Sequence, residues 1–285
     1  MRMHPSLGLA LAAGLVIALA FSPRTAFAAD EAKPAEEAKP PAEASSHAPE
    51  IKSQDWTFTG PFGAFDNAQL QRGYAVYKNV CAACHSLRLL SYRNLDEPGG
   101  PGFSPEAVAT LAAEAQVTDG PNDRGEMFQR PGRPSDRFRS PYANDATARI
   151  ANRGALPPDL SVMAKARPGG PEYIYALLTG YHQPPAGFEL AQGMHYNTAF
   201  PGHQIAMPPP LIDGSVPYTV GTKPTVDYYA RDVSAFLMWA AEPKLEERHM
   251  LGARVMVFLT VFAIIMFLAK RSVWGRLHGK AAHTA

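Results

Sequence analysis

Both cysteines of the 285-residue chain lie in one five-residue motif, Cys81-Ala82-Ala83-Cys84-His85. Two thiols three positions apart, followed at once by a histidine, are the signature of a covalently attached haem. We expect the motif at the start of a helix, where both thiols can bond the porphyrin vinyl groups from one side. His85 then lies one turn after Cys81 and can ligate the iron. The motif predicts one haem c per chain, with a fold built around it.

Two other readings of a Cys-X-X-Cys pair are a redox-active dithiol and half of a zinc site. A zinc site needs a second ligand pair at motif spacing, and a redox dithiol is typical of a βαβ context. The sequence offers neither feature.

The N-terminus has the three parts of a secretory signal. Arg2 supplies a basic start, Leu7 to Phe21 form an apolar run, and Ala26-Phe27-Ala28 form a small-residue cleavage pattern. We predict a signal peptide over residues 1–28. The alternative is a membrane anchor, for which an apolar run of about 15 residues is short.

The segment 29–50 is rich in Ala, Glu, Pro and Lys, so it has too little apolar surface to offset the entropy of ordering. We predict a disordered extension.

In an oxidising compartment two cysteines would ordinarily form a disulfide, but here the haem would consume both.

A second apolar run lies near the C-terminus. Residues 255–269 carry no charge, and counting back to Met250 gives a stretch of about 20 residues, the length of a transmembrane helix. Arg254 can extend its guanidinium to the outer interface. We predict a transmembrane helix over 250–269. A buried core helix is the alternative, but such a helix is rarely apolar on every face and then followed directly by cations.

The charges flanking this run set its orientation. Four cations and no acid follow the run: Lys270, Arg271, Arg276 and Lys280. By the positive-inside rule, residues 270–285 form a basic cytoplasmic tail and residues 51–247 a periplasmic domain. We therefore expect a single-pass protein of the bacterial inner membrane, in contact with membrane lipid.

The exposed domain reads as all-α with long irregular loops, since the chain has 27 prolines and 23 glycines and no long alternating apolar pattern. Helical spacing and capping residues predict four helices. They run from Asn67, capped by Asp66, to the haem motif, from Ser104 to about Gln116, from Pro171 to Thr179, and from Thr225 to Ala241.

Charge is balanced over residues 51–269, with 20 acids and 19 bases, so electrostatic docking must depend on local patches. An acidic block covers 88–127 and a basic block covers 128–153. Ordinary solvated surface is the alternative reading of both. No nucleic-acid partner is expected.

The sixth iron ligand decides the chemistry, because a second strong protein ligand makes an electron carrier and an open site permits gas or peroxide chemistry. Met207 precedes Pro208, Pro209 and Pro210, a stiff segment that can hold a thioether against iron. The properties of these residues alone do not decide between Met207 and the other candidates for the sixth ligand, because a methionine usually fills a gap in a hydrophobic core. The rivals are Met127, Met163, Met194, Met238, His182, His195 and His203.

From about residue 60 to the C-terminus the chain resembles the cytochrome c1 family, the haem subunit of quinol:cytochrome c oxidoreductase (the cytochrome bc1 complex). The resemblance is carried by Cys81 to His85, Asp119-Gly120-Pro121-Asn122, Gly125-Glu126-Met127-Phe128, Arg153 to Leu160, Leu177 to Tyr181, Tyr196-Asn197, Phe200-Pro201-Gly202, and Met207 with its prolines.

This resemblance implies a cytochrome c-like haem domain that has no catalytic site of its own. Electrons would arrive from a Rieske iron-sulfur protein and leave to a soluble or membrane-bound c-type cytochrome, with cytochrome b as the membrane neighbour. The family's methionine ligand falls on Met207, and its propionate-neutralising arginine on Arg149. The long extension and the lack of a further cysteine pair depart from some relatives.

Two rival functions stay open at this stage. One is a membrane-anchored monohaem carrier serving another respiratory dehydrogenase or oxidase. The other is a haem enzyme or gas sensor with an open or histidine-occupied sixth position. A further hypothesis is that the acidic block, including Asp96 and Glu97, helps to dock the acceptor.

Overall fold

The computed structural model describes residues 51–218 and 223–281, with side chains described up to residue 275. The predicted signal peptide and extension, residues 1–50, lie outside the described residues. So do the last four residues of the predicted cytoplasmic tail.

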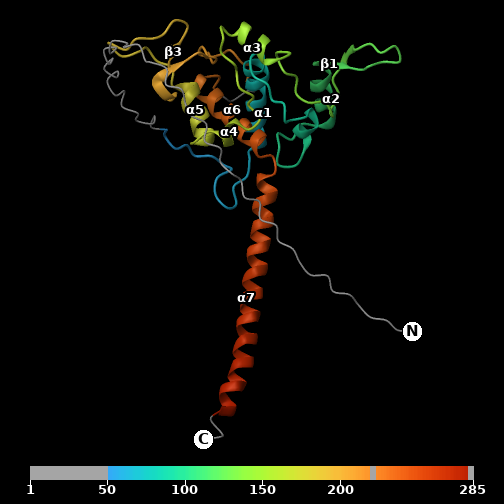
Figure 1. Cartoon of the computed structure of the whole chain (residues 1–285), viewed down its shortest axis with the longest axis vertical. Helices are drawn as coiled ribbons and strands as arrows, with labels where there is room; N and C mark the ends of the chain where they lie inside the picture. The colour runs from blue at the N-terminus through green and yellow to red at the C-terminus, as the bar shows by residue number, and fades with distance from the viewer. Residues whose placement is uncertain (1–50, 219–222, 282–285) are drawn as a thin grey trace, which may run out of the picture. The chain divides into compact units, whose positions relative to one another are not determined.

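Over the described ranges the chain folds mainly into helices joined by long loops (Figure 1). The α-helices are α1 (Asn67–Asn79), α2 (Pro105–Ala113), α3 (Asp145–Ala151), α4 (Met163–Ala166), α5 (Gly170–Thr179), α6 (Val226–Ala241) and α7 (Leu245–Ala281). The 3-10 helices are η1 (Cys81–Ala83), η2 (Tyr92–Asp96) and η3 (Pro201–His203). The expected all-α class is confirmed.

The strands are short and pair in two small antiparallel sheets. They are β1 (Gln116–Asp119) with β2 (Phe128–Pro131), and β3 (His195–Tyr196) with β4 (Gln204–Ile205). Among the described residues there is no larger sheet, in agreement with the absence of a long alternating pattern. These hairpins shape loops and do not form the core.

Most helix starts lie where the capping residues indicate. Asp66 accepts a hydrogen bond from the Ala68 amide at 2.9 Å, and Ser104 accepts one from Ala107 at 3.2 Å. The helix that begins after Ser104 ends at Ala113 instead of about Gln116, because the chain then turns into β1. The helices α5 and α6 match their predictions to within one residue.

The core forms where α1 packs against α6, with α4 and α5 on the same helix. Tyr74 and Tyr77 of α1 place their rings 5.8 and 5.9 Å from the ring of Phe236. Gly73 permits this approach, since a Cβ there would lie 2.2 Å from the Asp232 carbonyl oxygen. The helix that leads into the haem motif is therefore fixed along the most buried helix of the domain.

A buried ion pair joins the same two helices. The Asp232 carboxylate, 2% exposed, accepts hydrogen bonds from Arg72 at Nε (2.7 Å) and Nη2 (3.2 Å), and from the Tyr218 hydroxyl (2.8 Å). The interaction raises the pKa of Arg72. Three donors thus satisfy one buried acid and fix the register of α1 on α6.

The acidic and basic blocks meet in the β1–β2 hairpin. Arg130 pairs with Asp119 of the acidic block and, at 2.6 Å, with Asp136. The guanidinium lowers the pKa of Asp136 to about 2. Part of the charge in each block is therefore neutralised within the domain.

The helix α7 is the one helix of the described chain that is long and apolar enough to cross a membrane. Its candidate span covers Leu245–Gly275 and contains an 18-residue stretch with a mean hydropathy of 2.4. The predicted segment 250–269 lies inside this span, and large apolar side chains stay exposed along it. Pro243 lies in the short break between α6 and α7.

We expect Asp232→Ala to destabilise the domain by about 3 kcal/mol, because it leaves the Arg72 guanidinium and the Tyr218 hydroxyl without their shared acceptor. The midpoint of thermal unfolding, followed by circular dichroism in detergent, should fall by roughly 6–12 °C. The exposed Asp123→Ala serves as control and should change the midpoint little. Equal midpoints for both variants would contradict a stabilising role for this pair.

The candidate haem site

The Cys-X-X-Cys-His motif forms one tight turn directly after α1. The last residue of α1 is Asn79, and η1 begins at Cys81. We expected the motif at the start of a helix; it starts the short 3-10 helix η1 and not an α-helix, because Val80 leaves helical geometry after α1. The Cys81 carbonyl accepts hydrogen bonds from the Cys84 amide at 3.1 Å and the His85 amide at 2.8 Å. His85 is thus still one turn after Cys81.

The two cysteines are free thiols in different environments. Cys84 is exposed and Cys81 is partly buried. Burial raises the pKa of the Cys81 thiol to about 12, so this thiol is neutral at physiological pH. A redox-active cysteine has a lowered thiol pKa, the opposite of the direction at Cys81.

A hydrogen bond to the backbone fixes the His85 ring. Its Nδ1 lies 2.8 Å from the Pro158 carbonyl oxygen, which can only accept, so Nδ1 carries the proton. The other ring nitrogen, Nε2, is then unprotonated and has a lone pair for a metal. Burial lowers the pKa of His85 and favours this neutral, ligating form. Two free thiols and an oriented imidazole one turn apart fit a covalently attached haem.

The segment that carries Pro158 is clamped to the motif by neighbouring bonds. The Asp159 carboxylate accepts from the Ser86 hydroxyl at 2.7 Å and the Arg88 amide at 2.9 Å. The Leu160 amide donates to the Ser86 carbonyl at 2.9 Å. Burial raises the pKa of Asp159, but hydrogen bonds from Ser161, Arg88 and Ser86 outweigh it, and the pKa is lowered overall.

Sequence reasoning did not find the roles of Pro158 and Asp159. Both lie in the segment Arg153 to Leu160 that carries part of the family resemblance, but 73 residues separate His85 from Pro158. A backbone carbonyl as histidine partner leaves no trace in side-chain identity. Only the folded chain shows this contact.

Met207 lies just after β4 and is partly buried. Its carbonyl oxygen accepts a hydrogen bond from the Tyr181 hydroxyl at 3.1 Å. The same loop is anchored by the fully buried Asn197, whose Nδ2 donates to the Leu177 carbonyl at 2.8 Å. The backbone around Met207 is thus held to the end of α5, and three prolines follow it.

Four of the seven other candidates for the sixth position lie in other surroundings. Met163 and Met238 pack against the hydrophobic core. Met127 is 60% exposed next to the strand β2. The His203 ring lies 5.7 Å from the Tyr196 ring, with its Nδ1 3.2 Å from the Asn197 carbonyl.

Arg149 is an exposed residue of α3. Its Nη1 donates to the Gly154 carbonyl at 3.1 Å, in the loop that leads toward Pro158. One nitrogen of its guanidinium thus stabilises the loop. A guanidinium has five donors in all, so it can bind a further acceptor as well.

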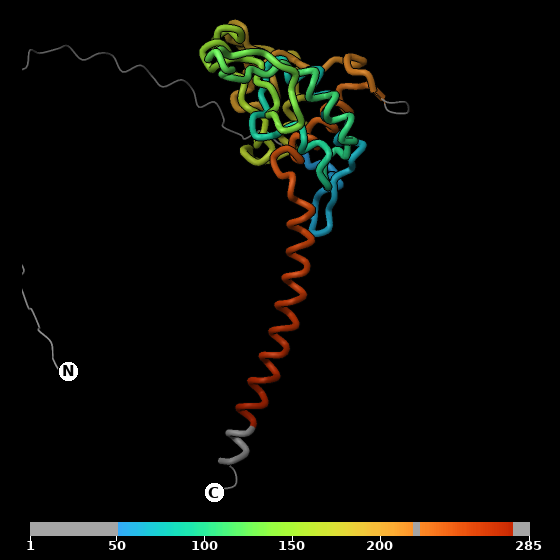
Figure 2. Tube along the Cα trace, turned by 90° about the vertical axis from the view of Figure 1, so that its right-hand side faces the viewer, coloured from blue at the N-terminus to red at the C-terminus, as the bar shows by residue number. Residues whose placement is uncertain are grey.

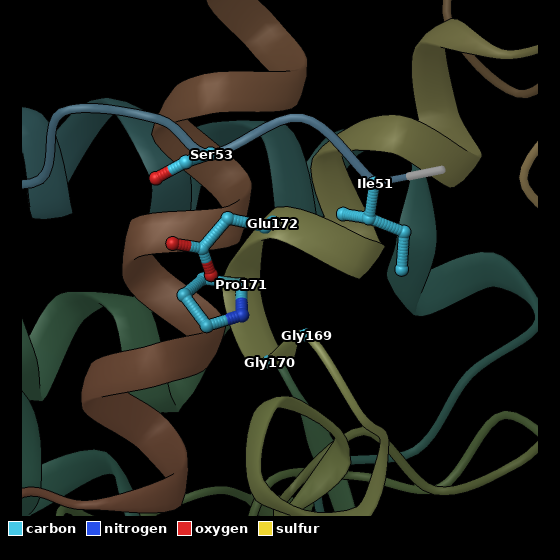
Figure 3. Close-up of a pocket in the computed structure, with 6 residues that line it drawn as sticks. All are labelled: Ile51, Ser53, Gly169, Gly170, Pro171 and Glu172. Atoms are coloured by element: carbon cyan, nitrogen blue, oxygen red, sulfur yellow. The ribbon is translucent and has the colours of Figure 1, made fainter. Parts of the chain in front are cut away.

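Two further features concern the zinc-site alternative and the surface cavities of the domain. Within the described ranges no group of three or more His, Cys, Asp or Glu side chains could hold a metal ion, so the zinc reading gains no further ligands. A surface cavity of about 420 Å³ lies beside the start of α5 (Figure 3). Its lining has no cysteine, histidine or methionine: Ile51, Ser53, Gly169, Gly170, Pro171 and Glu172.

A mainly helical domain with a Cys-X-X-Cys-His turn and an apolar C-terminal helix defines the class of membrane-anchored c-type cytochromes. The model of the Cytochrome C1 family matches residues 56–277, and the chain belongs to this family. The family binds haem c and acts as an electron-transfer subunit.

Relatives from bacteria and plants agree with this assignment. Cytochrome c1 of Rhodospirillum rubrum is 46% identical, over 79% of this chain and 87% of the relative. The mitochondrial cytochrome c1-2 heme protein of Solanum tuberosum is 47% identical, over 82% and 86%. Cytochrome b/c1 of Bradyrhizobium diazoefficiens is 48% identical over 78% of this chain, which spans only 35% of that longer protein.

We expect Asp159→Ala to loosen the clamp on the Pro158 segment, because it leaves the Ser86 hydroxyl and the Arg88 amide without an acceptor. The loss of about 2 kcal/mol should lower the thermal unfolding midpoint by roughly 4–8 °C. Asp159→Asn keeps a carbonyl acceptor and should lose less. An Asn variant as unstable as the Ala variant would show that the negative charge, not the hydrogen bonds, stabilises the segment.

Proposed function

We propose that Cys81 and Cys84 would hold one haem c through thioether bonds, that His85 and Met207 would ligate its iron, and that Arg149 would neutralise a propionate. The observation that carries this proposal is the His85 ring, whose Nδ1 is bonded to the Pro158 carbonyl so that Nε2 is free to ligate. Bound in this way, haem iron supplies one-electron redox chemistry, and a methionine ligand raises its reduction potential.

The residues of the chain then have three tasks. His85 and the clamp around Asp159 hold one ligand in a fixed tautomer and orientation. Met207, on a loop bonded to Tyr181 and stiffened by prolines, would supply the second iron ligand and so exclude small external ligands. Arg149 compensates the negative charge of a propionate. None of these tasks needs a general acid, base or nucleophile.

We propose that the chain is the cytochrome c1 subunit of a quinol:cytochrome c oxidoreductase. It would accept one electron from a Rieske iron-sulfur protein and pass it to a soluble or membrane-bound c-type cytochrome. The family membership supports this role. The Bradyrhizobium relative, named cytochrome b/c1, supports cytochrome b as a membrane neighbour.

The domain order proposed from the sequence completes this picture. A cleaved signal peptide over 1–28 would deliver residues 51–247 to the periplasm. The helix α7 would cross the inner membrane once and leave the basic tail, 270–285, in the cytoplasm. The cations after residue 269 support this orientation.

The acidic block offers some side chains to an acceptor more readily than others. Glu97 accepts from Asn94 at 2.9 Å and lies 3.7 Å from the Lys244 Nζ near the start of α7, so its charge is partly compensated. Asp119 is paired with Arg130. Asp123 and Glu126, exposed in the β1–β2 loop, are better candidates for docking a basic partner.

We expect Met207→Ala to remove the thioether ligand. The oxidised protein should lose its sulfur-to-iron charge-transfer band, and its reduction potential should fall by on the order of 0.1–0.3 V. Visible absorption and redox titration of the purified protein measure both effects. Met163→Leu, at another partly buried methionine, is the matched control and should leave both unchanged. An unaltered spectrum in Met207→Ala would contradict the assignment of Met207.

Purification of the tagged full-length chain from native membranes in mild detergent tests the proposed assembly. We expect stoichiometric cytochrome b and a Rieske iron-sulfur protein, together with quinol-dependent reduction of the haem. A dehydrogenase or oxidase in their place would favour the rival function. A stable lone subunit would contradict membership of the complex.

A further inference from the structure

The stretch 56–65, just before α1, has no charged residue and contains four aromatic side chains. Three of them form a buried stack. Trp56, Phe58 and Phe65 are 5%, 4% and 7% exposed, with ring centroids 5.4 Å apart for Trp56–Phe58 and 5.0 Å for Phe58–Phe65. The fourth, Phe62, is 85% exposed. The core alone does not account for an aromatic ring at this position.

A backbone hydrogen bond and two glycines fix the shape of the turn that presents Phe62. The Ala64 amide donates to the Thr57 carbonyl at 3.1 Å and closes the loop at its base. Gly60 has a φ of +82°, which favours glycine. A Cβ at Gly63 would lie 2.3 Å from the Phe58 carbonyl carbon, so no larger residue fits there. Phe62 is thus the exposed tip of an ordered loop.

Two contacts fix this loop to the first turns of α7. The Phe65 amide donates to Glu246 Oε1 at 2.8 Å, and His249 Nδ1 lies 3.3 Å from the Gly63 carbonyl oxygen. The loop, blue in Figures 1 and 2, lies beside the upper end of α7 in both views. Phe62 is the immediate neighbour of a residue that contacts His249.

The level of this contact along α7 indicates what surrounds Phe62. The exposed apolar surface of α7 begins one residue after His249, where Met250 and Leu251 are 54% and 60% exposed. The segment 250–269 has the length of a hydrocarbon core, so His249 is at the level of the outer headgroups. Trp and Tyr are enriched at this level, and Phe is among the apolar residues that interfacial segments bury at the boundary between headgroups and acyl chains.

We propose that the Phe62 loop is a second membrane contact of this chain, with the Phe62 ring in the outer lipid interface beside α7. Together with α7 it would give the haem domain two points of attachment and so limit its tilt on the membrane. The inference rests on α7 crossing the membrane. The Gly63–His249 contact puts the loop at the level of α7 where the exposed apolar surface begins, and this favours lipid as the occupant over a protein subunit.

A nitroxide spin label at Phe62→Cys tests the proposal in the full-length, haem-loaded chain, reconstituted in phosphatidylcholine–phosphatidylglycerol vesicles. With Cys81 and Cys84 bound to haem, the introduced thiol is the one that reacts, and the unsubstituted chain reports any failure of this premise. Ile150→Cys on α3, where Ile150 is 84% exposed, is the control of matched exposure. The readout is the collision rate with oxygen, which partitions into lipid, and with a water-soluble nickel chelate.

We expect the oxygen-to-nickel ratio at position 62 to exceed that at position 150 by roughly threefold or more. Equal ratios would overturn the proposal. In membranes containing the partner subunits, a label at 62 shielded from both reagents would mean that protein covers Phe62, which also overturns it. Loss of the chain from vesicles in a carbonate wash would instead show that α7 is no anchor. Phe62→Trp, tested by quenching with brominated lipids, gives a second measure that retains an aromatic ring.

Discussion

The hydrogen bond between His85 Nδ1 and the Pro158 carbonyl is the interaction on which the proposed haem site depends. A histidine can ligate iron only through a nitrogen that carries no proton, and its ring must point in one direction. The Pro158 carbonyl meets both conditions with a single acceptor. Asp159 and Leu160 hold this acceptor in place through Ser86 and Arg88, so a backbone contact has the support of several others.

The packing of α1 on α6 fixes the chain that leads into the same site. The haem motif follows the end of α1 directly, so its position depends on where α1 is fixed. The close approach at Gly73 and the buried Arg72–Asp232 pair together set that register. The contact between α1 and α6 therefore carries both a steric and a charged constraint on the helix that leads into the haem motif.

Much of the architecture could be predicted from local signals. Capping residues such as Asp66 and Ser104 specify helix starts, and the apolar stripe of α6 specifies its buried face, because both are properties of neighbouring residues. Predictions failed where a distant partner decides. The helix after Ser104 stops early because β1 pairs with β2. The sequence also did not show that Arg130 lies between Asp119 and Asp136, which neutralises part of the charge of both blocks within the domain.

By itself the sequence determined the kind of chemistry and the membrane attachment. Thiol spacing, a following histidine and a continuous apolar run are one-dimensional features, and covalent haem attachment and membrane insertion respond to them directly. Only the tertiary structure decided which group orients His85, which charges neutralise one another, and that Phe62 is exposed beside α7 while three neighbouring aromatics are buried. Each of these depends on contacts that form only in the folded chain, over separations such as six residues for Arg130–Asp136 and 73 residues for His85–Pro158.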